Sequence, residues 1–173
     1  MIAFDANVLS LLLYSKSSVP LDFRDQKPIL YAKERIDSLV TDLEEREETI
    51  VVPTPALSEV LVLVAPDVQQ YIDILSKSKC FQIKPFGMKA AIEVAIRVKE
   101  AKQKGDKREG LVGEWDKIKY DRQIVAIAKS EGASEIYSTD EDVHRHAKLW
   151  GIVPLNVSDI PIPQAQQSLE MDA

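Results

Sequence analysis

The chain has 173 residues, of which 45% are apolar and 29% charged, a globular composition that argues against an intrinsically disordered protein. Its single cysteine, Cys80, excludes a disulfide framework and a cysteine-based zinc site, and it fits a reducing compartment. The net charge of −6 argues against a protein that binds polyanions over its whole surface.

Short apolar segments alternate with amphipathic ones, and this alternation predicts strands that alternate with helices. The predicted strands are 1–4, 50–52, 81–83, 135–139 and 152–155. The predicted helices are 6–14, 30–48, 54–64, 66–78, 88–103, 115–131 and 141–150. Thr54 is expected to cap the third helix and Pro66 to open the fourth. This order predicts an α/β fold in which helices sandwich a mainly parallel sheet.

The length favours one domain, over residues 1–158. Residues 159–173, rich in Pro and Gln, are expected to form a flexible tail. No apolar run is long enough to cross a bilayer, and residues 1–14 contain Asp5 and lack the basic start of a signal peptide. We therefore expect a mature cytoplasmic protein with no membrane contact.

Positive charge is concentrated in residues 77–129, which hold 14 of the 22 Lys and Arg residues but 7 of the 28 Asp and Glu residues. Such a segment is either a set of solvated helix faces or one cationic surface on an acidic protein. The sequence leaves both interpretations open.

Carboxylates follow two predicted strands, at the sheet edge where open α/β proteins bind ligands. Asp5 directly follows strand 1–4, Asp140 directly follows strand 135–139, and Asp142 comes two residues later. Each of Asp5 and Asp140, taken alone, could be an ordinary helix N-cap. Their shared position at one edge of the sheet makes them candidate site residues.

Two further carboxylates lie on apolar segments. Glu59, one turn into helix 54–64, is flanked by apolar residues. Asp121 points to the buried side of helix 115–131, because a helical projection groups it with Ile118, Ile124, Val125 and Ala128. A carboxylate among apolar neighbours needs a partner, a proton or a metal. A lysine for Glu59 and an arginine for Asp121 are the simpler alternatives.

Together these carboxylates would repel one another, since their segments contain no matching buried base. Crowding of this kind would raise the pKa of at least one of them, and bringing them together requires a cation. Ligands that are all oxygen atoms select hard ions such as Mg²⁺ or Mn²⁺. Because Mg²⁺ typically binds substrate phosphates, the pattern predicts a metal site that acts on a phosphate ester.

Four segments resemble, in order, the four acidic motifs of PIN domains. They are Ile2-Ala3-Phe4-Asp5-Ala6-Asn7, Ser58-Glu59-Val60, Tyr120-Asp121-Arg122-Gln123-Ile124-Val125-Ala126-Ile127-Ala128 and Ser138-Thr139-Asp140-Glu141-Asp142. The resemblance covers about residues 1–155 and implies a Rossmann-like α/β/α sandwich and a metal-dependent endoribonuclease. Many small members of this family are toxins of VapBC-type toxin–antitoxin pairs. This chain is longer than such toxins usually are, with extra residues in loop 15–28, helix 30–48 and the tail.

The resemblance also implies roles for single residues. The catalytic acidic quartet is matched by Asp5, Glu59, Asp121 and Asp140. The residues that would hold Mg²⁺ or Mn²⁺ are Asp5, Asp121, Asp140 and Asp142, the last matching an acid that is often present. Glu59 would complete the metal shell or help to activate the attacking water. Asn7 and Thr139 match polar residues that orient the carboxylates.

In-line attack would leave a 5′-phosphate and a 3′-hydroxyl, and the cationic segment would hold the RNA backbone. Its candidate RNA-binding residues are Lys104, Lys107, Arg108, Lys117, Lys119 and Arg122. A cognate antitoxin and a homodimer are further partners that the resemblance leaves open. His144 is interpreted as a solvated or capping residue rather than as a general base.

Two other functions compete with the ribonuclease. A non-catalytic PIN-like module would act through protein contacts and would have no reason to bind a metal. A phospho-receiver would carry adjacent acids after its first strand, and a haloacid-type phosphatase would carry Asp-x-Asp there. Asp5-Ala6-Asn7 fits neither of these last two classes.

Overall fold

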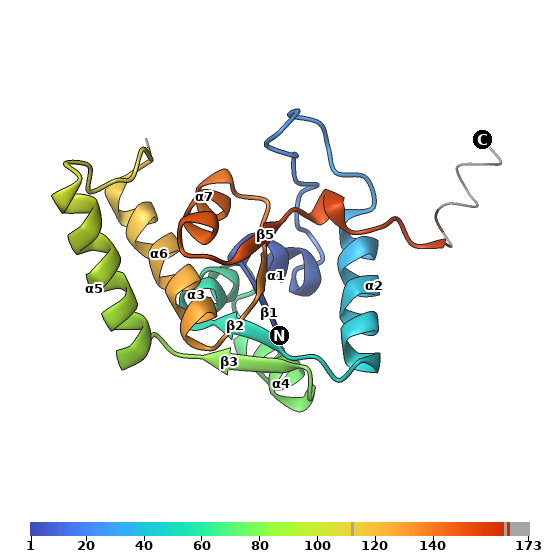
Figure 1. Cartoon of the computed structure of the whole chain (residues 1–173). Coiled ribbons are helices and arrows are strands. Elements are labelled where there is room, and N and C mark those ends of the chain that lie inside the picture. The colour runs from blue at the N-terminus through green and yellow to red at the C-terminus, as the bar shows by residue number, and fades with distance from the viewer. Residues whose placement is uncertain (112, 165, 167–173) are drawn as a thin grey trace.

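The structure is a computed structural model that describes residues 1–111, 113–164 and 166 (Figure 1). Its strands are β1 (Ile2–Phe4), β2 (Ile50–Pro53), β3 (Phe81–Lys84), β4 (Glu135–Tyr137) and β5 (Val153–Leu155). Its helices are α1 (Ala6–Leu13), α2 (Ala32–Glu45), α3 (Thr54–Leu63), α4 (Val68–Lys77), α5 (Met88–Gln103), α6 (Trp115–Ser130) and α7 (Glu141–Leu149). A 3-10 turn (Val157–Asp159) follows β5. The predicted alternation of strands and helices is therefore confirmed.

The five strands form one sheet in the order β3-β2-β1-β4-β5, and all four pairings are parallel. From β1 the chain builds one side of the sheet through β2 and β3, and it then crosses back to build the other side through β4 and β5. The direction of construction thus reverses between β1 and β4. In α/β proteins, ligands bind at such a point, beyond the carboxyl ends of the strands.

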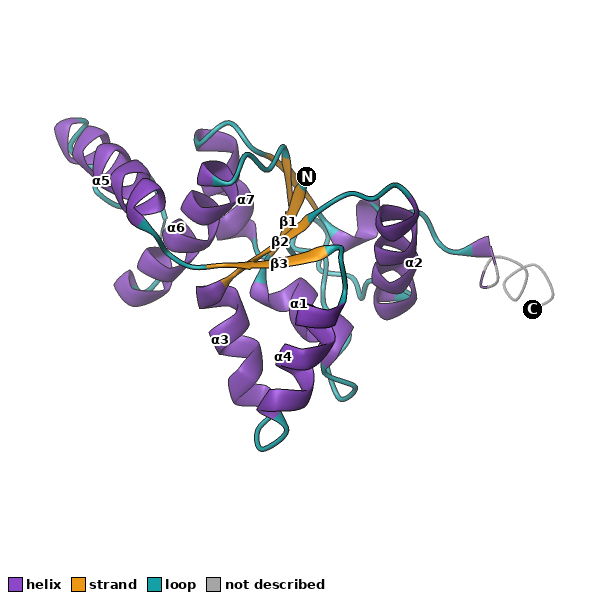
Figure 2. Cartoon of the chain, turned by 90° about the horizontal axis from the view of Figure 1, so that it is seen from below, coloured by secondary structure: helices purple, strands orange, loops and turns teal. Residues whose placement is uncertain are grey.

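Helices cover both faces of the sheet (Figure 2). Helices α1, α3 and α4 lie on one face, α6 and α7 lie on the other, and α5 packs against the outside of α6. Strands β1 and β2 are apolar along their whole length and fully buried, as expected for parallel strands covered on both sides. Phe4 lies in the core, where its ring packs edge-on against Phe81 and Tyr137.

Helix boundaries differ from the predicted ones at two prolines. Pro53, with extended backbone, takes the N-cap position of α3, so Thr54 is the first helical residue rather than the cap. Pro66 does not open α4, which begins two residues later at Val68. Both differences are local and leave the order of the elements unchanged.

The segment after β5 is packed onto the domain farther than the sequence indicated. Asn156 caps the 3-10 turn through a reciprocal pair of hydrogen bonds with Asp159, and Ile160 is buried. Residues 165 and 167–173 of the predicted flexible tail lie outside the described residues, so its flexibility stays a prediction. Among the described helices, none combines the length and the apolar character that a membrane span requires.

The long loop 15–28 is fastened to this turn. Leu21 pairs with Pro28 in an isolated antiparallel bridge, which closes the loop. Arg24 binds both carboxylate oxygens of Asp22 and also binds Asp159, at 2.8 Å. These hydrogen bonds from Arg24 hold the pKa of Asp22 well below its usual range. The extra residues of this loop therefore form an ordered part of the domain.

Candidate metal centre

The carboxyl ends of β1 and β4 bring two of the predicted acids together. Asp5 directly follows β1 and is buried, while Asp140 caps α7. Ser138 lies between them: its hydroxyl donates to Oδ2 of Asp5 at 2.7 Å and accepts from the backbone N–H of Asp140 at 2.9 Å. Because β1 and β4 are neighbours in the sheet, two acids far apart in sequence become neighbours in space.

The other two members of the predicted quartet come from helices. Asp121 lies on the inner face of α6 with only 6% of its surface exposed, which confirms the orientation predicted by the helical projection. Glu59 reaches the same place from α3, on the opposite side, and is exposed. All four acids line one open pocket of about 350 Å³, together with Ala6, Asn7, Lys117 and Tyr120.

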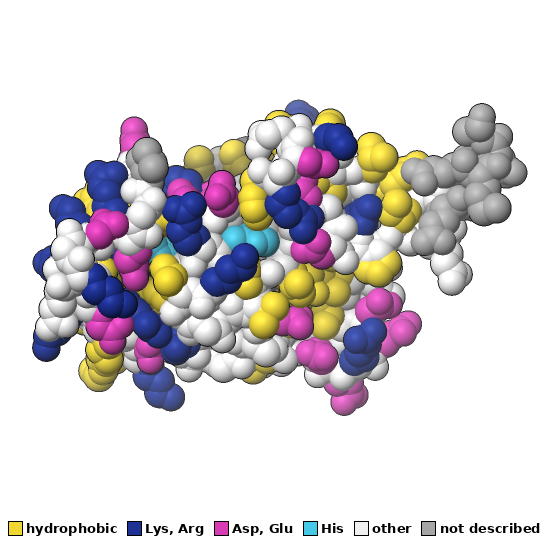
Figure 3. Space-filling model, turned by 45° about the horizontal axis from the view of Figure 1, so that its top comes forward, with side chains coloured by type: hydrophobic (Ala, Val, Ile, Leu, Met, Phe, Trp, Pro, Cys, Tyr) yellow, Lys and Arg dark blue, Asp and Glu magenta, His cyan; other side chains and the backbone are white. Residues whose placement is uncertain are grey.

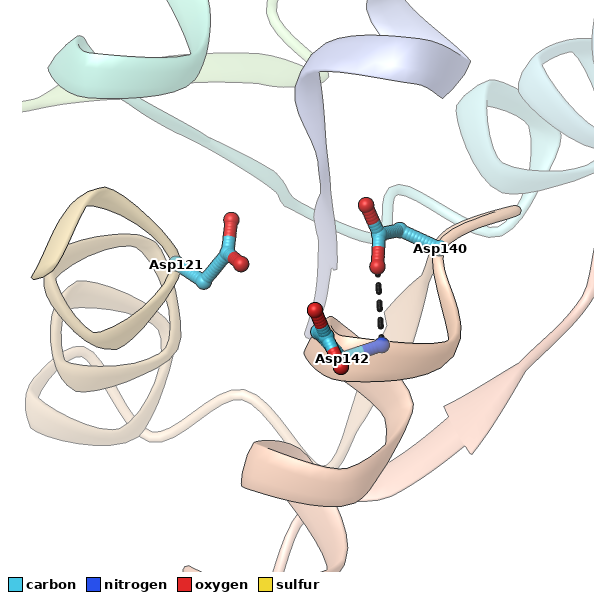
Figure 4. Close-up of side chains that lie close together, drawn as sticks. All are labelled: Asp121, Asp140 and Asp142. Atoms are coloured by element: carbon cyan, nitrogen blue, oxygen red, sulfur yellow. Dashed lines mark hydrogen bonds between the residues drawn. The ribbon is translucent and has the colours of Figure 1, made fainter. Parts of the chain in front are cut away.

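Asp142 extends the acidic group beyond the quartet (Figure 4). Its backbone N–H donates to Asp140 at 2.8 Å, which places the two carboxylates side by side at the start of α7. Asp121, Asp140 and Asp142 each offer one oxygen, and these three oxygens lie within 4.8 Å of one another. We refer to these three residues as the acidic triad.

The donor set of the triad fits a hard divalent cation. Its side chains offer only carboxylate oxygens, the ligand type that Mg²⁺ and Mn²⁺ prefer. Mg²⁺ binds oxygens at roughly 2.0–2.1 Å, so oxygens that share one ion lie at most about 4.2 Å apart, and the three carboxylates need to draw together only slightly from their present spacing to hold one ion. Asp5 lines the same pocket and would add a fourth carboxylate to the shell.

Lys117 lies inside the acidic triad, a position that sequence reasoning did not foresee. Its Nζ is 2.9 Å from Asp121, 2.9 Å from Asp140 and 3.3 Å from Asp142. The segments of these acids were expected to contain no matching buried base, and the partly buried Lys117 corrects that expectation. The lysine was predicted to bind RNA, and here its ammonium is occupied by the acids. A lysine one helical turn before a buried aspartate, at i and i+4, was the available signal.

Burial raises the pKa of several of these acids. It raises the pKa of Asp5 to about 6, although the hydrogen bond from Ser138 lowers it in part. It raises the pKa of Asp121 to about 7, against the opposing hydrogen bond and charge of Lys117. The pocket walls partly desolvate the carboxylate of Glu59 although the residue reaches solvent, and this desolvation, followed by the charge of Asp121, raises the pKa of Glu59. The expected rise is thus present, but burial rather than crowding of like charges is its main cause.

The polar residues near the acids differ from the expected pair. Ser138, one residue before Thr139, supplies the hydroxyl that binds Asp5. Asn7 is exposed at the pocket, and Thr139 lines a neighbouring hollow that Asn7 also borders. Their predicted role in orienting carboxylates stays a prediction. The signal for Ser138 was its position directly after β4 and two residues before Asp140.

His144 was expected to be a solvated or capping residue, and its burial shows that the solvated alternative is wrong. Only 7% of its surface is exposed, its Nε2 lies 2.8 Å from the carbonyl oxygen of Ser138, and its ring packs edge-on against Phe23. Burial lowers its pKa. His144 therefore supports the backbone beside the site.

The predicted RNA-binding residues divide into exposed and buried groups. Figure 3 shows Lys and Arg side chains gathered at the end of the molecule formed by α5 and the loop after it. Lys104 and Lys107 are exposed there, and Lys107 lies over the ring of Trp115. Lys119 is also exposed but pairs with Asp116.

Two arginines of the predicted set are engaged within the protein. Arg108 is half-buried and donates to the backbone carbonyl of Gly113 at 2.8 Å. Arg122 is only 1% exposed and pairs with Glu109 at 2.9 Å. The guanidinium of Arg122 therefore faces the interior and is not exposed to RNA as the side chains of Lys104 and Lys107 are.

Comparisons with known proteins identify the fold. No protein-family profile matches the chain, and no curated protein matches its sequence significantly. A chain of VapBC2 from Rickettsia felis, bound to a DNA fragment from its promoter, matches with a TM-score of 0.56 at 18% identity, over 90% of this chain and 98% of that one. A chain of FitAB bound to an IR36 DNA fragment matches with a TM-score of 0.56 at 17% identity, over 94% and 99%.

A chain of DNA-bound VapBC from Salmonella typhimurium matches with a TM-score of 0.53 at 15% identity, over 91% of this chain and 99% of that one. The three structures thus share their fold with nearly the whole chain. These matches confirm the predicted α/β class and the PIN-like architecture of the parallel sheet.

Proposed function

We propose that this chain is a divalent-metal-dependent endoribonuclease of the PIN type. The observation that carries the proposal is the convergence of Asp5, Glu59, Asp121 and Asp140 on one open pocket, from four separate elements. Acids that served only as helix caps or surface residues would not be expected to converge at the topological switch point between β1 and β4, where α/β proteins bind ligands.

The residues divide the work by burial and position. Asp121, Asp140 and Asp142 would hold the ion, since their oxygens already lie within 4.8 Å of one another. Asp5 is buried and oriented by Ser138, so it forms the fixed wall of the site. A divalent ion here supplies Lewis acidity toward the phosphate and lowers the pKa of a water.

Glu59 is the candidate proton acceptor. It is exposed at the pocket, across from the triad, and its raised pKa brings it nearer to neutrality, where a general base works best. Water would attack phosphorus, Glu59 would take the proton of that water, and the bond from phosphorus to the 3′-oxygen would break as a solvent water protonates the departing oxygen. The products would be a 5′-phosphate and a 3′-hydroxyl.

RNA and an antitoxin are the proposed partners. The exposed Lys104, Lys107 and Lys119 would contact backbone phosphates and position the strand near the pocket. The fold shared with VapBC and FitAB chains supports an antitoxin as the protein partner. We expect such an enzyme to act in the cytoplasm, where its RNA substrate is made.

The non-catalytic module remains the second candidate, and Lys117 is the observation that favours it. An acidic group already partly neutralised by an internal ammonium can persist as a structural element without a metal. Metal binding and metal-dependent cleavage distinguish the two functions.

The test is cleavage of a long structured RNA in Mg²⁺ or Mn²⁺, with EDTA as the metal-free reference. We expect the wild type to cleave only with metal and Asp5→Asn to be slower by about a hundredfold or more. Asp37→Asn is the matched control, because Asp37 is an exposed acid on α2 that pairs with Lys33 outside the pocket. Equal cleavage by Asp5→Asn, or none by the folded wild type, would favour the module.

A further inference from the structure

Lys117 satisfies the acidic triad without a metal. An ammonium has three N–H donors, and the Nζ of Lys117 lies within 3.3 Å of one oxygen from each of the three carboxylates. A divalent ion shared by the same carboxylates would need to sit among the same oxygens, at roughly 2.0–2.1 Å for Mg²⁺. The two cations would therefore compete for one position.

Helix α6 positions the ammonium of Lys117 among the triad carboxylates, and it leaves the lysine side chain open to solvent. Lys117 lies one turn before Asp121 on α6, so their side chains share a face, while Asp140 and Asp142 approach from the start of α7. The side chain of Lys117 is 44% exposed, against 9% for that of Asp121. Its flexible four-carbon stem can thus carry the ammonium into solvent while the buried acid stays in place.

In the metal-free protein, the ammonium of Lys117 reduces the repulsion among the three carboxylates of the triad. Three carboxylates with oxygens within 4.8 Å of one another repel each other unless a positive charge lies between them. Lys117 supplies that charge from within the chain, which keeps the ligands assembled. A metal ion must displace this ammonium. The loss of its three contacts with the carboxylates makes the net free energy of metal binding less favourable.

We propose that Lys117 is a tethered competitor of the divalent metal, a positioning residue that holds the triad assembled when metal is scarce and weakens metal affinity. The proposal rests on the proposed metal site. It predicts that the affinity for the metal rises when the charge of Lys117 is removed, and that the ammonium leaves the triad when metal binds.

The first test measures Mn²⁺ binding by isothermal titration calorimetry on the full-length chain, without RNA. Lys117→Met keeps the length of the stem but removes the charge, and we expect its Kd for Mn²⁺ to fall on the order of tenfold, the loss of about one charge-assisted hydrogen bond. Lys33→Met is the matched control and should bind Mn²⁺ as the wild type does, because Lys33 also pairs with an aspartate one helical turn later, Asp37, but on α2.

The second test needs no change at Lys117 in the protein observed. The Nζ resonance of Lys117 in the ¹⁵N-labelled wild type, assigned by its loss in Lys117→Arg, should move toward the value of a solvated lysine as Mg²⁺ is added. This measurement stands even if Lys117→Met fails to fold.

The outcomes separate the inference from the function on which it rests. An equal or higher Kd in folded Lys117→Met, or an unmoved Nζ resonance while the wild type binds Mg²⁺, would overturn the competitor role and leave the metal site intact. If neither the wild type nor Lys117→Met binds Mn²⁺, the inference and the proposed metal-dependent function both fail.

Discussion

The hydroxyl of Ser138 binds Oδ2 of Asp5 at 2.7 Å, although 133 positions separate the two residues in the chain. The same hydroxyl accepts a hydrogen bond from the backbone of Asp140. One side chain therefore fixes the relative position of two acids that follow neighbouring strands.

We predict that Ser138→Ala shifts the acidic limb of the pH–rate profile to higher pH. The hydrogen bond from Ser138 lowers the pKa of Asp5, so its loss should raise that pKa above about 6. One hydrogen bond to a carboxylate corresponds to about one pH unit. Cleavage rates measured from pH 5 to 9 at constant ionic strength test this. Ser134→Ala, whose hydroxyl binds the carbonyl of Met1 at the other end of β4, is the control and should leave the profile unchanged.

We predict that Asp5→Asn stabilises the metal-free protein at neutral pH. The pKa of Asp5 is raised from 3.8 to about 6, so the folded state binds more protons than the unfolded state between these values. The stability that Asp5 contributes in its protonated form is therefore lost as pH rises through about 6. The gain in unfolding free energy over the wild type should grow from pH 4 to pH 7, by up to roughly 2–3 kcal/mol.

Urea unfolding in EDTA at several pH values measures this difference. Asp116→Asn serves as the control for loss of one exposed negative charge. If the gain in unfolding free energy of Asp5→Asn stayed constant from pH 4 to pH 7, or if the variant were less stable than the wild type at pH 7, the buried carboxylate of Asp5 would not destabilise the metal-free protein as predicted.

We predict that the four acids act as a unit in catalysis. Asp5→Ala, Glu59→Ala, Asp121→Ala and Asp140→Ala should each remove most metal-dependent cleavage, and double variants should be little slower than single ones, because the loss of one acid misplaces the rest. Asp142→Ala should cost less, because Asp142 is not among the residues that line the pocket where the four acids meet and the other carboxylates can still hold an ion there. Single-turnover rates measure this, with circular dichroism to confirm folding. Losses that multiply in the double variants would show that the acids contribute independently.

We predict that the exposed lysines bind RNA through phosphates and without sequence preference. Replacing Lys104, Lys107 and Lys119 with Gln should weaken binding similarly for unrelated RNAs and reduce the salt slope by about 0.7 per lost contact on single strands. Arg122 is left unchanged because it is buried against Glu109. Filter binding at several salt concentrations tests this, and an unchanged slope would identify these charges as a solvated face.

The sequence predicted those parts of the site that depend on local structure. Asp5 directly follows β1 and Asp140 comes three residues after the end of β4, and acids so close to strand ends reach the carboxyl edge of a parallel sheet. The buried orientation of Asp121 followed from its apolar neighbours on the same face of α6. For these residues, the helical periodicity of the apolar positions and the location just after a strand were sufficient to predict where the side chain lies.

The remaining features depend on how separate elements pack. Arg122 is hidden because the loop 105–113 carries Glu109 over it, and no periodicity on α6 reports what a distant loop covers. Lys117 meets Asp140 and Asp142 only because α7 starts beside α6. His144 lies on a polar helix and yet is buried, since Phe23 from the loop 15–28 packs on its ring.

The pairing of β1 with β4 sets the moment at which a newly made chain acquires its site. Ile2 pairs with Glu135, so β1 can pair with β4 only after the ribosome has synthesised more than 130 further residues. Asp5 and Glu59 emerge early, but Asp140 joins them only after β4 has left the exit tunnel and inserted beside β1. A nascent chain therefore lacks the complete acidic pocket during most of its synthesis, and under the proposed ribonuclease function this delay would protect its own messenger from cleavage.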